Sequence, residues 1–263
     1  MKSRPYIIVG NWKMYKTIDQ ALSFIDEIAT FADSARCQVW LAVPFTAIKS
    51  CSDRVKGTKI LIGAQNMNDA KEGAFTGEVA ASMLRDAGAD FVILGHSERR
   101  KVFAESDEFI NCKVKRAIES NLKFILCIGE TFDEREQGKT EEVLKRQLEK
   151  GLASVKAESV ANIHISYEPV WAIGTGKAAM SEMVEEAHSF CRKVLTELLG
   201  EAAAKKIPLL YGGSVNPDNA NNFLAEPDVD GLLIGSASLQ AESFAKIIKL
   251  LQNSPKTTVE IPL

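Results

Sequence analysis

The feature that most limits the possible folds of this chain is a set of short apolar runs that recur along its whole length. Eight can be recognised: Tyr6–Val9, Val39–Val43, Ile60–Ile62, Phe91–Leu94, Phe124–Ile128, Ile163–Ser166, Ile207–Tyr211 and Val229–Ile234. The runs show little alternation of apolar and polar residues, which is typical of parallel strands that are covered on both faces. We therefore predict eight buried strands.

Amphipathic helical patterns lie between several of these runs. Apolar residues three or four positions apart form four stripes: Leu22, Ile25 and Ala29; Leu144, Leu148, Leu152 and Val155; Val184, Ala187, Cys191, Val194, Leu195 and Leu198; and Phe244, Ile247, Ile248 and Leu251. This spacing puts each stripe on one face of a helix. Strands that alternate with helices indicate βαβ units and a parallel sheet.

Eight such units in a chain of 263 residues fit a closed (β/α)₈ barrel, which is the α/β fold that we predict. An open, doubly wound sheet is the alternative, although no GxGxxG motif follows the first run. No linker or shift in composition divides the chain. We therefore expect a single domain over residues 1–263, with a short C-terminal tail from about Asn253.

Composition and charge argue against several functional classes. The 32 basic and 35 acidic residues give a net charge of −3, without the basic excess expected of a protein that binds nucleic acid or an anionic membrane. No run approaches the roughly 18 apolar residues of a membrane-spanning helix. The five cysteines are scattered, and none forms a metal-binding motif with histidine. Reduced thiols in the cytoplasm are the simplest interpretation.

One stretch, YEPVWAIGTGK at residues 167–177, combines a carboxylate with an apolar loop. Pro169 keeps the preceding Glu168 out of helical geometry, so the carboxylate is expected at a strand end. Trp171 and Ile173 are unusually apolar for a loop, and the glycines that follow allow backbone movement. We interpret the stretch as a lid hinged beside a base. The alternative is an ordinary surface loop with a solvated Glu168.

Polar residues follow five of the predicted strands. They are Asn11 and Lys13 after the first, His96, Ser97 and Glu98 after the fourth, Glu168 after the sixth, Gly212, Gly213 and Ser214 after the seventh, and Gly235 and Ser236 after the eighth. Taken singly, each could be a surface charge, a hydrogen-bonded histidine or a plain turn. In a barrel, however, all would surround the same mouth, where active sites lie.

These residue types together fit one kind of chemistry. Glycine-rich turns present backbone N–H groups that bind phosphate. A carboxylate can remove a proton next to a carbonyl group, while an imidazole and an ammonium group stabilise the enediolate that forms. We therefore predict a proton-transferring isomerase for a small phosphorylated carbonyl compound, with no metal or cofactor.

Six motifs, in order along nearly the whole chain, resemble those of the triosephosphate isomerase family. They are GNWKMY (10–15), GAFTGE (73–78), GHSERR (95–100), CIGE (127–130), YEPVWAIGTGK (167–177) and YGGSV (211–215). The resemblance implies interconversion of dihydroxyacetone phosphate and D-glyceraldehyde 3-phosphate, without a cofactor, in glycolysis and gluconeogenesis.

The resemblance also implies roles for individual residues. Glu168 is expected to be the general base and His96 the neutral electrophile, with Asn11 and Lys13 completing a polar cage. Glu98 would support Lys13. Backbone donors to phosphate would be Gly174, Ser214, Gly235 and Ser236. The position of Ser236 departs from the family, which often has Gly-Gly after the last strand, and so does the absence of a proline just beyond the lid.

A homodimer is expected through the loop Gln65–Glu78, because an aromatic residue, Phe75, lies near its tip and is more stable when covered by a partner. The resemblance implies that Thr76 reaches the partner subunit's Asn11 and Lys13. A loop folded back on its own surface is the alternative. For the function, the alternatives are another phosphosugar enzyme such as an epimerase, or a barrel that binds ligands without turnover.

Overall fold

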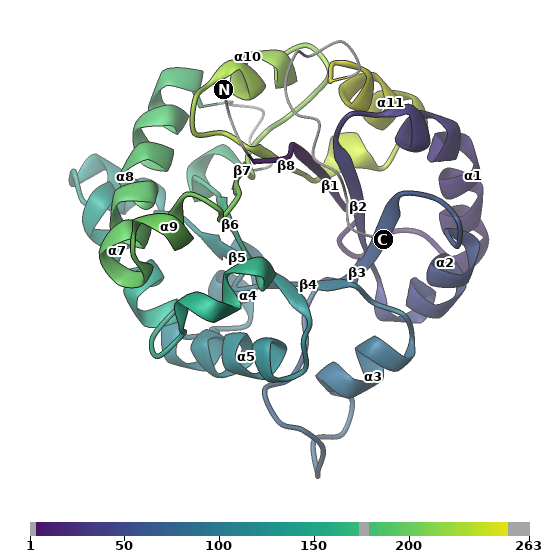
Figure 1. Ribbon diagram of the computed structural model, residues 1–263, viewed down its shortest axis with the longest axis horizontal. Coiled ribbons are helices and arrows are strands. Elements are labelled where there is room, and N and C mark those ends of the chain that lie inside the picture. The colour runs from purple at the N-terminus through teal and green to yellow at the C-terminus, as the bar shows by residue number, and fades with distance from the viewer. Residues whose placement is uncertain (1–3, 174–178, 252–263) are drawn as a thin grey trace.

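Eight parallel strands close into a barrel in this computed structural model, which describes residues 4–173 and 179–251. Each strand pairs with the next in the sequence, and the last pairs with the first. Figure 1 shows the strands around the centre and the helices in a ring outside them. The predicted (β/α)₈ barrel is therefore confirmed.

All eight apolar runs correspond to strands. The strands are β1 (Ile7–Asn11), β2 (Gln38–Val43), β3 (Ile60–Ala64), β4 (Phe91–Leu94), β5 (Lys123–Ile128), β6 (Ile163–Tyr167), β7 (Leu209–Tyr211) and β8 (Gly231–Ile234). The helices are α1 (Ile18–Ser34), α2 (Ile48–Arg54), α3 (Ala81–Asp86), α4 (Ser97–Val102), α5 (Asp107–Glu119), α6 (Phe132–Glu136), α7 (Thr140–Gly151), α8 (Ser181–Leu199), α9 (Glu201–Ala204), α10 (Ala220–Ala225) and α11 (Ala241–Lys249). Short 3₁₀ turns are η1 (Phe45–Ala47), η2 (Ala157–Asn162), η3 (Val170–Ala172) and η4 (Ser236–Ser238).

The strands are apolar on both sides because each side faces a different core. In β1, Ile7 and Val9 point into the barrel, whereas Ile8 between them packs outward against the helices. Successive side chains of a strand point to opposite faces of the sheet, so a barrel wrapped in helices needs apolar residues at consecutive positions. This double burial explains the unbroken runs in the sequence.

The helical stripes are largely as predicted, but Leu152 and Val155 lie beyond the end of α7, Leu251 lies beyond the end of α11, and the stripe of α1 needs a correction. Its buried residues are Ala21, Phe24, Ile25, Ile28 and Ala32, whereas Leu22 and Ala29 are only half-buried. The predicted buried face of α1 was therefore rotated by about one residue from the observed face, because the predicted stripe left out Phe24 and Ile28. At the end of α8, Leu198 is 38% exposed and also lies outside the core.

The segment between β3 and α3 projects from the barrel, at the bottom of Figure 1. Residues 71–78 are all exposed, and Phe75 in the projecting part is 51% exposed. The loop therefore stands out from the barrel as the sequence predicted. The predicted tail from Asn253 and the lid residues Gly174 and Gly176 lie outside the described residues. Among the helices of the described part of the chain, none is long and apolar enough to cross a membrane.

A histidine that the sequence did not single out lies within the barrel. His164 of β6 is 6% exposed and packs edge-on against Trp40, with 4.7 Å between ring centroids. Its Nδ1 has no hydrogen-bond partner within the described residues. Burial, helped by the positive charge of Lys123, lowers the pKa of His164 from 6.5 to about 4. The folded protein therefore requires the neutral ring.

Acid should weaken the fold through this residue. Unfolded chains take up the proton near pH 6.5 and the folded protein only near pH 4, so stability is complete above pH 6.5 and falls as the pH decreases toward 4. The loss is on the order of 3 kcal/mol. Urea unfolding of the protein and of His164→Leu at pH 7 and pH 4.5 measures it. The variant should lose roughly 2 kcal/mol less between these pH values; equal losses in both proteins would contradict the assignment.

Candidate active site

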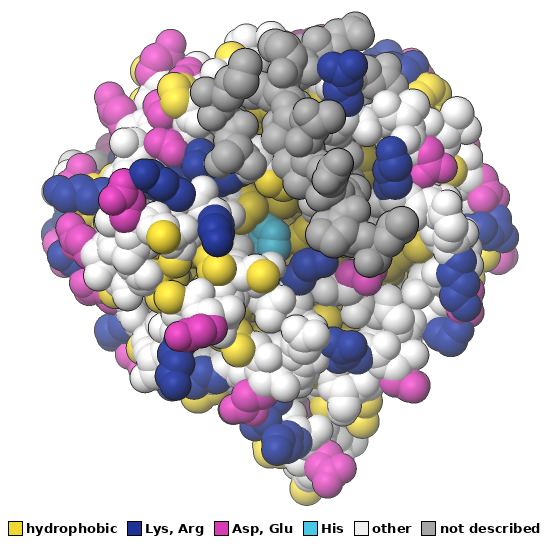
Figure 2. Space-filling view, viewed as in Figure 1, with side chains coloured by type: hydrophobic (Ala, Val, Ile, Leu, Met, Phe, Trp, Pro, Cys, Tyr) yellow, Lys and Arg dark blue, Asp and Glu magenta, His cyan; other side chains and the backbone are white. Residues whose placement is uncertain are grey.

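A cavity of about 620 Å³ opens at the C-terminal ends of the strands. Its lining includes these residues singled out from the sequence: Asn11, Lys13, His96, Glu168, Gly212, Gly213, Ser214, Gly235 and Ser236. Glu98 is not part of the lining but contacts it through Lys13, and Gly174 lies outside the described residues. Figure 2 shows the opposite end of the barrel, at the N-terminal ends of the strands, where a histidine side chain lies at the centre among hydrophobic side chains. Residues from five strand ends thus converge on one mouth.

The carboxylate of Glu168 is held inside this cavity rather than in solvent. Glu168 directly follows β6 and is 2% exposed. Its backbone N–H donates to the carbonyl of Ile128 at 2.7 Å, which continues the pairing of β6 with β5. One carboxylate oxygen accepts a hydrogen bond from the backbone N–H of Ser97 at 3.2 Å, and the other lies 3.4 Å from His96 Nε2. The alternative interpretation of this stretch, an ordinary surface loop with a solvated Glu168, is therefore wrong.

The orientation of His96 follows from its place before a helix. His96 is the N-cap of α4, and its Nδ1 accepts a hydrogen bond from the backbone N–H of Glu98 at 3.2 Å. A ring nitrogen that accepts this bond carries no proton, so the proton of the neutral ring lies on Nε2. The N–H that remains therefore faces Glu168 and the cavity.

Lys13 is fixed by an unusual backbone and by an ion pair. It has a positive φ of 51°, which non-glycine residues seldom adopt. Its N–H donates to Asn11 Oδ1 at 3.1 Å, and its ammonium group lies 2.6 Å from a carboxylate oxygen of Glu98. These contacts hold a cation at the mouth of the barrel, on the same side as His96.

Glycine is required at the turn after β7 because neighbouring groups occupy the space of a side chain. A Cβ on Gly212 would stand 2.7 Å from Ser166 Oγ and 2.8 Å from Glu168 Cγ. At Gly235 a Cβ would make only an ordinary contact, 3.5 Å from Cε of Lys13, so the turn after β8 has room for a side chain. Gly235 is the N-cap of η4, and the first N–H groups of a helical turn have no partner within it. The turn therefore offers free donors next to the lysine.

The turn η3, which follows Glu168, contacts a buried cluster that sequence reasoning missed. Glu130 is fully buried, and its Oε1 accepts hydrogen bonds from Trp171 Nε1 at 2.9 Å, from Tyr167 OH at 3.2 Å and from Arg135 at 3.2 Å. Burial, followed by the charge of Glu130, raises the pKa of Tyr167. The CIGE motif was the available signal, because it ends in this glutamate.

A buried thiol also lies beside the carboxylate of Glu168. Cys127 of β5 points into the barrel and is 1% exposed. Burial, and after it the negative charge of Glu168, raises the pKa of Cys127 well above its usual value. The side chain therefore remains a neutral thiol and adds no second charge near the carboxylate.

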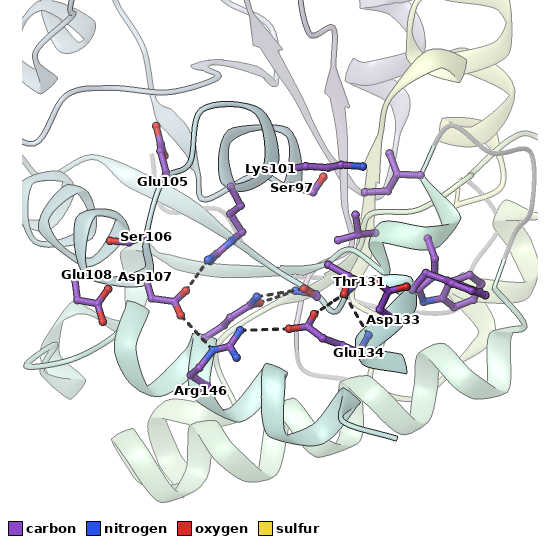
Figure 3. Close-up of a pocket in the computed structure, with 17 residues that line it drawn as sticks. Ser97, Lys101, Glu105, Ser106, Asp107, Glu108, Thr131, Asp133, Glu134 and Arg146 are labelled. Atoms are coloured by element: carbon purple, nitrogen blue, oxygen red, sulfur yellow. Dashed lines mark hydrogen bonds and ion pairs between the residues drawn. The ribbon is translucent and has the colours of Figure 1, made fainter. Parts of the chain in front are cut away.

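A second and larger cavity, of about 1010 Å³, borders η3 (Figure 3). Its charged groups are largely paired with one another. Asp107 binds Arg100 at 2.5 Å and Arg146 at 3.5 Å, and Arg146 lies 3.8 Å from Glu134. Despite its size, this cavity does not contain Lys13, His96 or Glu168, so the smaller cavity is the better candidate for catalysis.

Comparison with known proteins agrees with this geometry. The family model described as triosephosphate isomerase matches residues 6–251. Among curated relatives, triosephosphate isomerase of Protochlamydia amoebophila is 51% identical over 245 residues, covering 93% of both chains. That of Carboxydothermus hydrogenoformans is 49% identical over 94% of this chain and 98% of its own.

A solved structure has the same architecture. The crystal structure of triosephosphate isomerase from Bartonella henselae superposes with a TM-score of 0.85 and 41% sequence identity, over 93% of this chain and 98% of that one. Both the family match and the identity to the relatives extend across the barrel and its strand ends. The chain belongs to the triosephosphate isomerase family.

Proposed function

We propose that Glu168 is the general base in the isomerisation that this family performs, the interconversion of dihydroxyacetone phosphate and D-glyceraldehyde 3-phosphate. The observation that carries this assignment is the position of its carboxylate, which is buried and lies 3.4 Å from His96 Nε2. A buried base next to a neutral N–H donor can take a proton from carbon while the donor binds the adjacent oxygen.

The reaction then proceeds in two proton transfers at carbon and one between the two oxygens. Glu168 removes a proton from the carbon next to the carbonyl group, and the electron pair of the broken C–H bond forms the enediolate. The Nε2–H of His96 and the ammonium group of Lys13 stabilise the negative oxygen, with Asn11 orienting Lys13 through its backbone. Glu168 returns the proton to the neighbouring carbon, and the hydroxyl proton passes from one oxygen to the other with the help of His96 Nε2, so that hydroxyl and carbonyl groups exchange places.

The phosphate of the substrate is assigned to the turns after β7 and β8. The contributing groups are the backbone N–H groups of Ser214, Gly235 and Ser236, together with that of Gly174 in the lid. The hydroxyl of Ser214 is already used, since it donates to the carbonyl of Ala172 at 2.5 Å. Free N–H groups at the start of a helical turn suit an anion.

Replacing Glu168 by glutamine tests the base. The Glu168→Gln side chain keeps its shape and can still accept a hydrogen bond from Ser97, but it cannot take up the proton. We expect kcat to fall by about 10³-fold or more, with little change in the inhibition constant of inorganic phosphate. A coupled assay on glyceraldehyde 3-phosphate, with chelator present, measures both. Near-normal turnover of the purified variant would refute the assignment.

Ser236 should be compatible with phosphate binding, although the family often has glycine there. Ser236 does not have a positive φ, so its Cβ causes no backbone strain. We expect Ser236→Gly to change the inhibition constant of inorganic phosphate by less than about tenfold, or roughly 1.4 kcal/mol. Much tighter inhibition of the variant would mean that the side chain obstructs the phosphate, and much weaker inhibition would mean that the hydroxyl binds it.

We also propose that the protein is a homodimer, with the loop Gln65–Glu78 inserted into the partner. Large apolar side chains are exposed in the segments that follow β1 to β4, namely Met14, Tyr15, Phe45, Phe75, Val102 and Phe103. Loops at one end of neighbouring strands form a common surface, and an apolar patch of this kind is more stable when covered. Thr76 would then reach the partner subunit's Asn11 and Lys13.

Sedimentation at micromolar concentration tests the dimer. We expect twice the 28.8 kDa of one chain, and Phe75→Asp should raise the dissociation constant of the dimer by at least about tenfold because it buries a charge in the interface. Phe132→Asp is the matched control, since Phe132 is similarly exposed, at 55%, but lies on α6. A monomer mass for the unmodified protein would disprove the proposal.

We place the enzyme in the cytoplasm. All five cysteines are free thiols, and four of them are buried, as expected where disulfides do not form. The family reaction belongs to glycolysis and gluconeogenesis.

A further inference from the structure

β5 extends beyond the end of its shorter neighbour β4. Side chains make the hydrogen bonds to this part of the chain that a longer β4 would make. Leu94, the last residue of β4, pairs with Leu126, whereas β5 continues to Ile128. Buried backbone N–H and C=O groups need partners. Arg100 supplies one by donating to the carbonyl of Cys127 at 3.1 Å.

Gln147 of α7 provides hydrogen-bond partners for the next peptide groups that lack a strand partner, those of Gly129. The N–H of Gly129 donates to Gln147 Oε1 at 2.7 Å, and Gln147 Nε2 donates to the carbonyl of Gly129 at 3.2 Å. A side-chain amide has both a donor and an acceptor, so it can pair with a backbone as another strand would. Gln147 is 5% exposed, and water therefore competes little for these bonds.

Gly129 in turn lies directly against the main chain of Glu168. A side chain on Gly129 would overlap the main-chain carbonyl group of Glu168. The residue before Gly129, Ile128, accepts a hydrogen bond from the N–H of Glu168 at 2.7 Å. The backbone at the end of β5 is therefore the surface on which the carboxylate-bearing residue rests.

We propose that Gln147 is a positioning residue for the general base: it holds the peptide groups of Gly129, and Gly129 holds the main chain of Glu168. The inference rests on the proposed role of Glu168. Gln147 contacts neither the catalytic cavity nor the phosphate turns, so its effect should be on the proton transfer and not on substrate binding.

The larger cavity explains why catalysis should suffer more than folding. Gln147 and Gly129 both border it. When the amide is removed, water from this cavity can satisfy the polar groups of Gly129 at little free-energy cost. Water does not fix their position, however, and small displacements of a reacting group are costly in rate.

Gln147→Leu removes both hydrogen bonds at nearly constant volume. We expect kcat to fall by at least about tenfold, while KM and the inhibition constant of inorganic phosphate change by less than about twofold. Kinetics of the folded protein, with its melting temperature, measure the split. An unchanged kcat, or a rise in KM that accounts for the whole loss, would overturn the inference.

Asn111→Leu is the matched control. Asn111 is another buried amide, and its Nδ2 donates to the carbonyls of Gly151 and Ala153 at 2.9 and 3.1 Å, at the C-terminal end of α7, about one turn after Gln147. Its loss should lower the melting temperature without changing kcat. If both variants lose kcat equally, the effect comes from general loosening of α7, and Gln147 has no positioning role.

Two further variants complete the test. If Gln147→Leu does not fold, Gln147→Glu keeps the acceptor for the N–H of Gly129 but loses the donor; we expect a lower kcat with unchanged KM, and a normal kcat would overturn the inference. In the double variant with Glu168→Gln, the loss of Gln147 should lower kcat no further, because both act on the same proton transfer. Full additivity would refute the coupling. A normal kcat for Glu168→Gln alone would instead refute the base assignment.

Discussion

The backbone ladder of the closed parallel sheet is the interaction on which the rest of the molecule depends. All strands run in one direction, so their C-terminal ends lie around one mouth. The backbone hydrogen bonds of each strand fix the position of the residue that directly follows it. Glu168 illustrates this, since its N–H continues the pairing of β6 with β5. The positions of residues in the candidate catalytic cavity thus depend more on strand register than on loop structure.

Side chains provide hydrogen-bond partners for peptide groups that the backbone ladder leaves unpaired. Strands of unequal length leave unpaired peptide groups at the rim, and Arg100 and Gln147 bind those of β5. Within the mouth, the carboxylate of Glu168 has a backbone donor and an imidazole beside it, while Cys127 stays uncharged. Polar contacts therefore help to hold the rim, which suits a place where water and substrate must enter.

The sequence predicted the parts of this structure that depend on local pattern. The strands could be recognised because burial on both faces requires consecutive apolar residues, and the strand ends could be recognised as the site because parallel strands share an exit. The face of α1 was misplaced, since Phe24 and Ile28 lie one turn apart on a face that the chosen stripe missed. Contacts such as Gln147 with Gly129 could not be predicted, because they join a helix to a strand end through geometry that no spacing reveals.

The pairing of β8 with β1 has a consequence for how the protein is made. Ile7 at the start of the chain finds its partner in Gly231 near the end, and Trp12 donates to the carbonyl of Ser238. On the ribosome, the first strand therefore emerges long before the strand that completes its edge. Until the last strand is synthesised the barrel cannot close, and the mouth at the strand ends is incomplete. A ligand that binds at this mouth can therefore stabilise only the finished barrel.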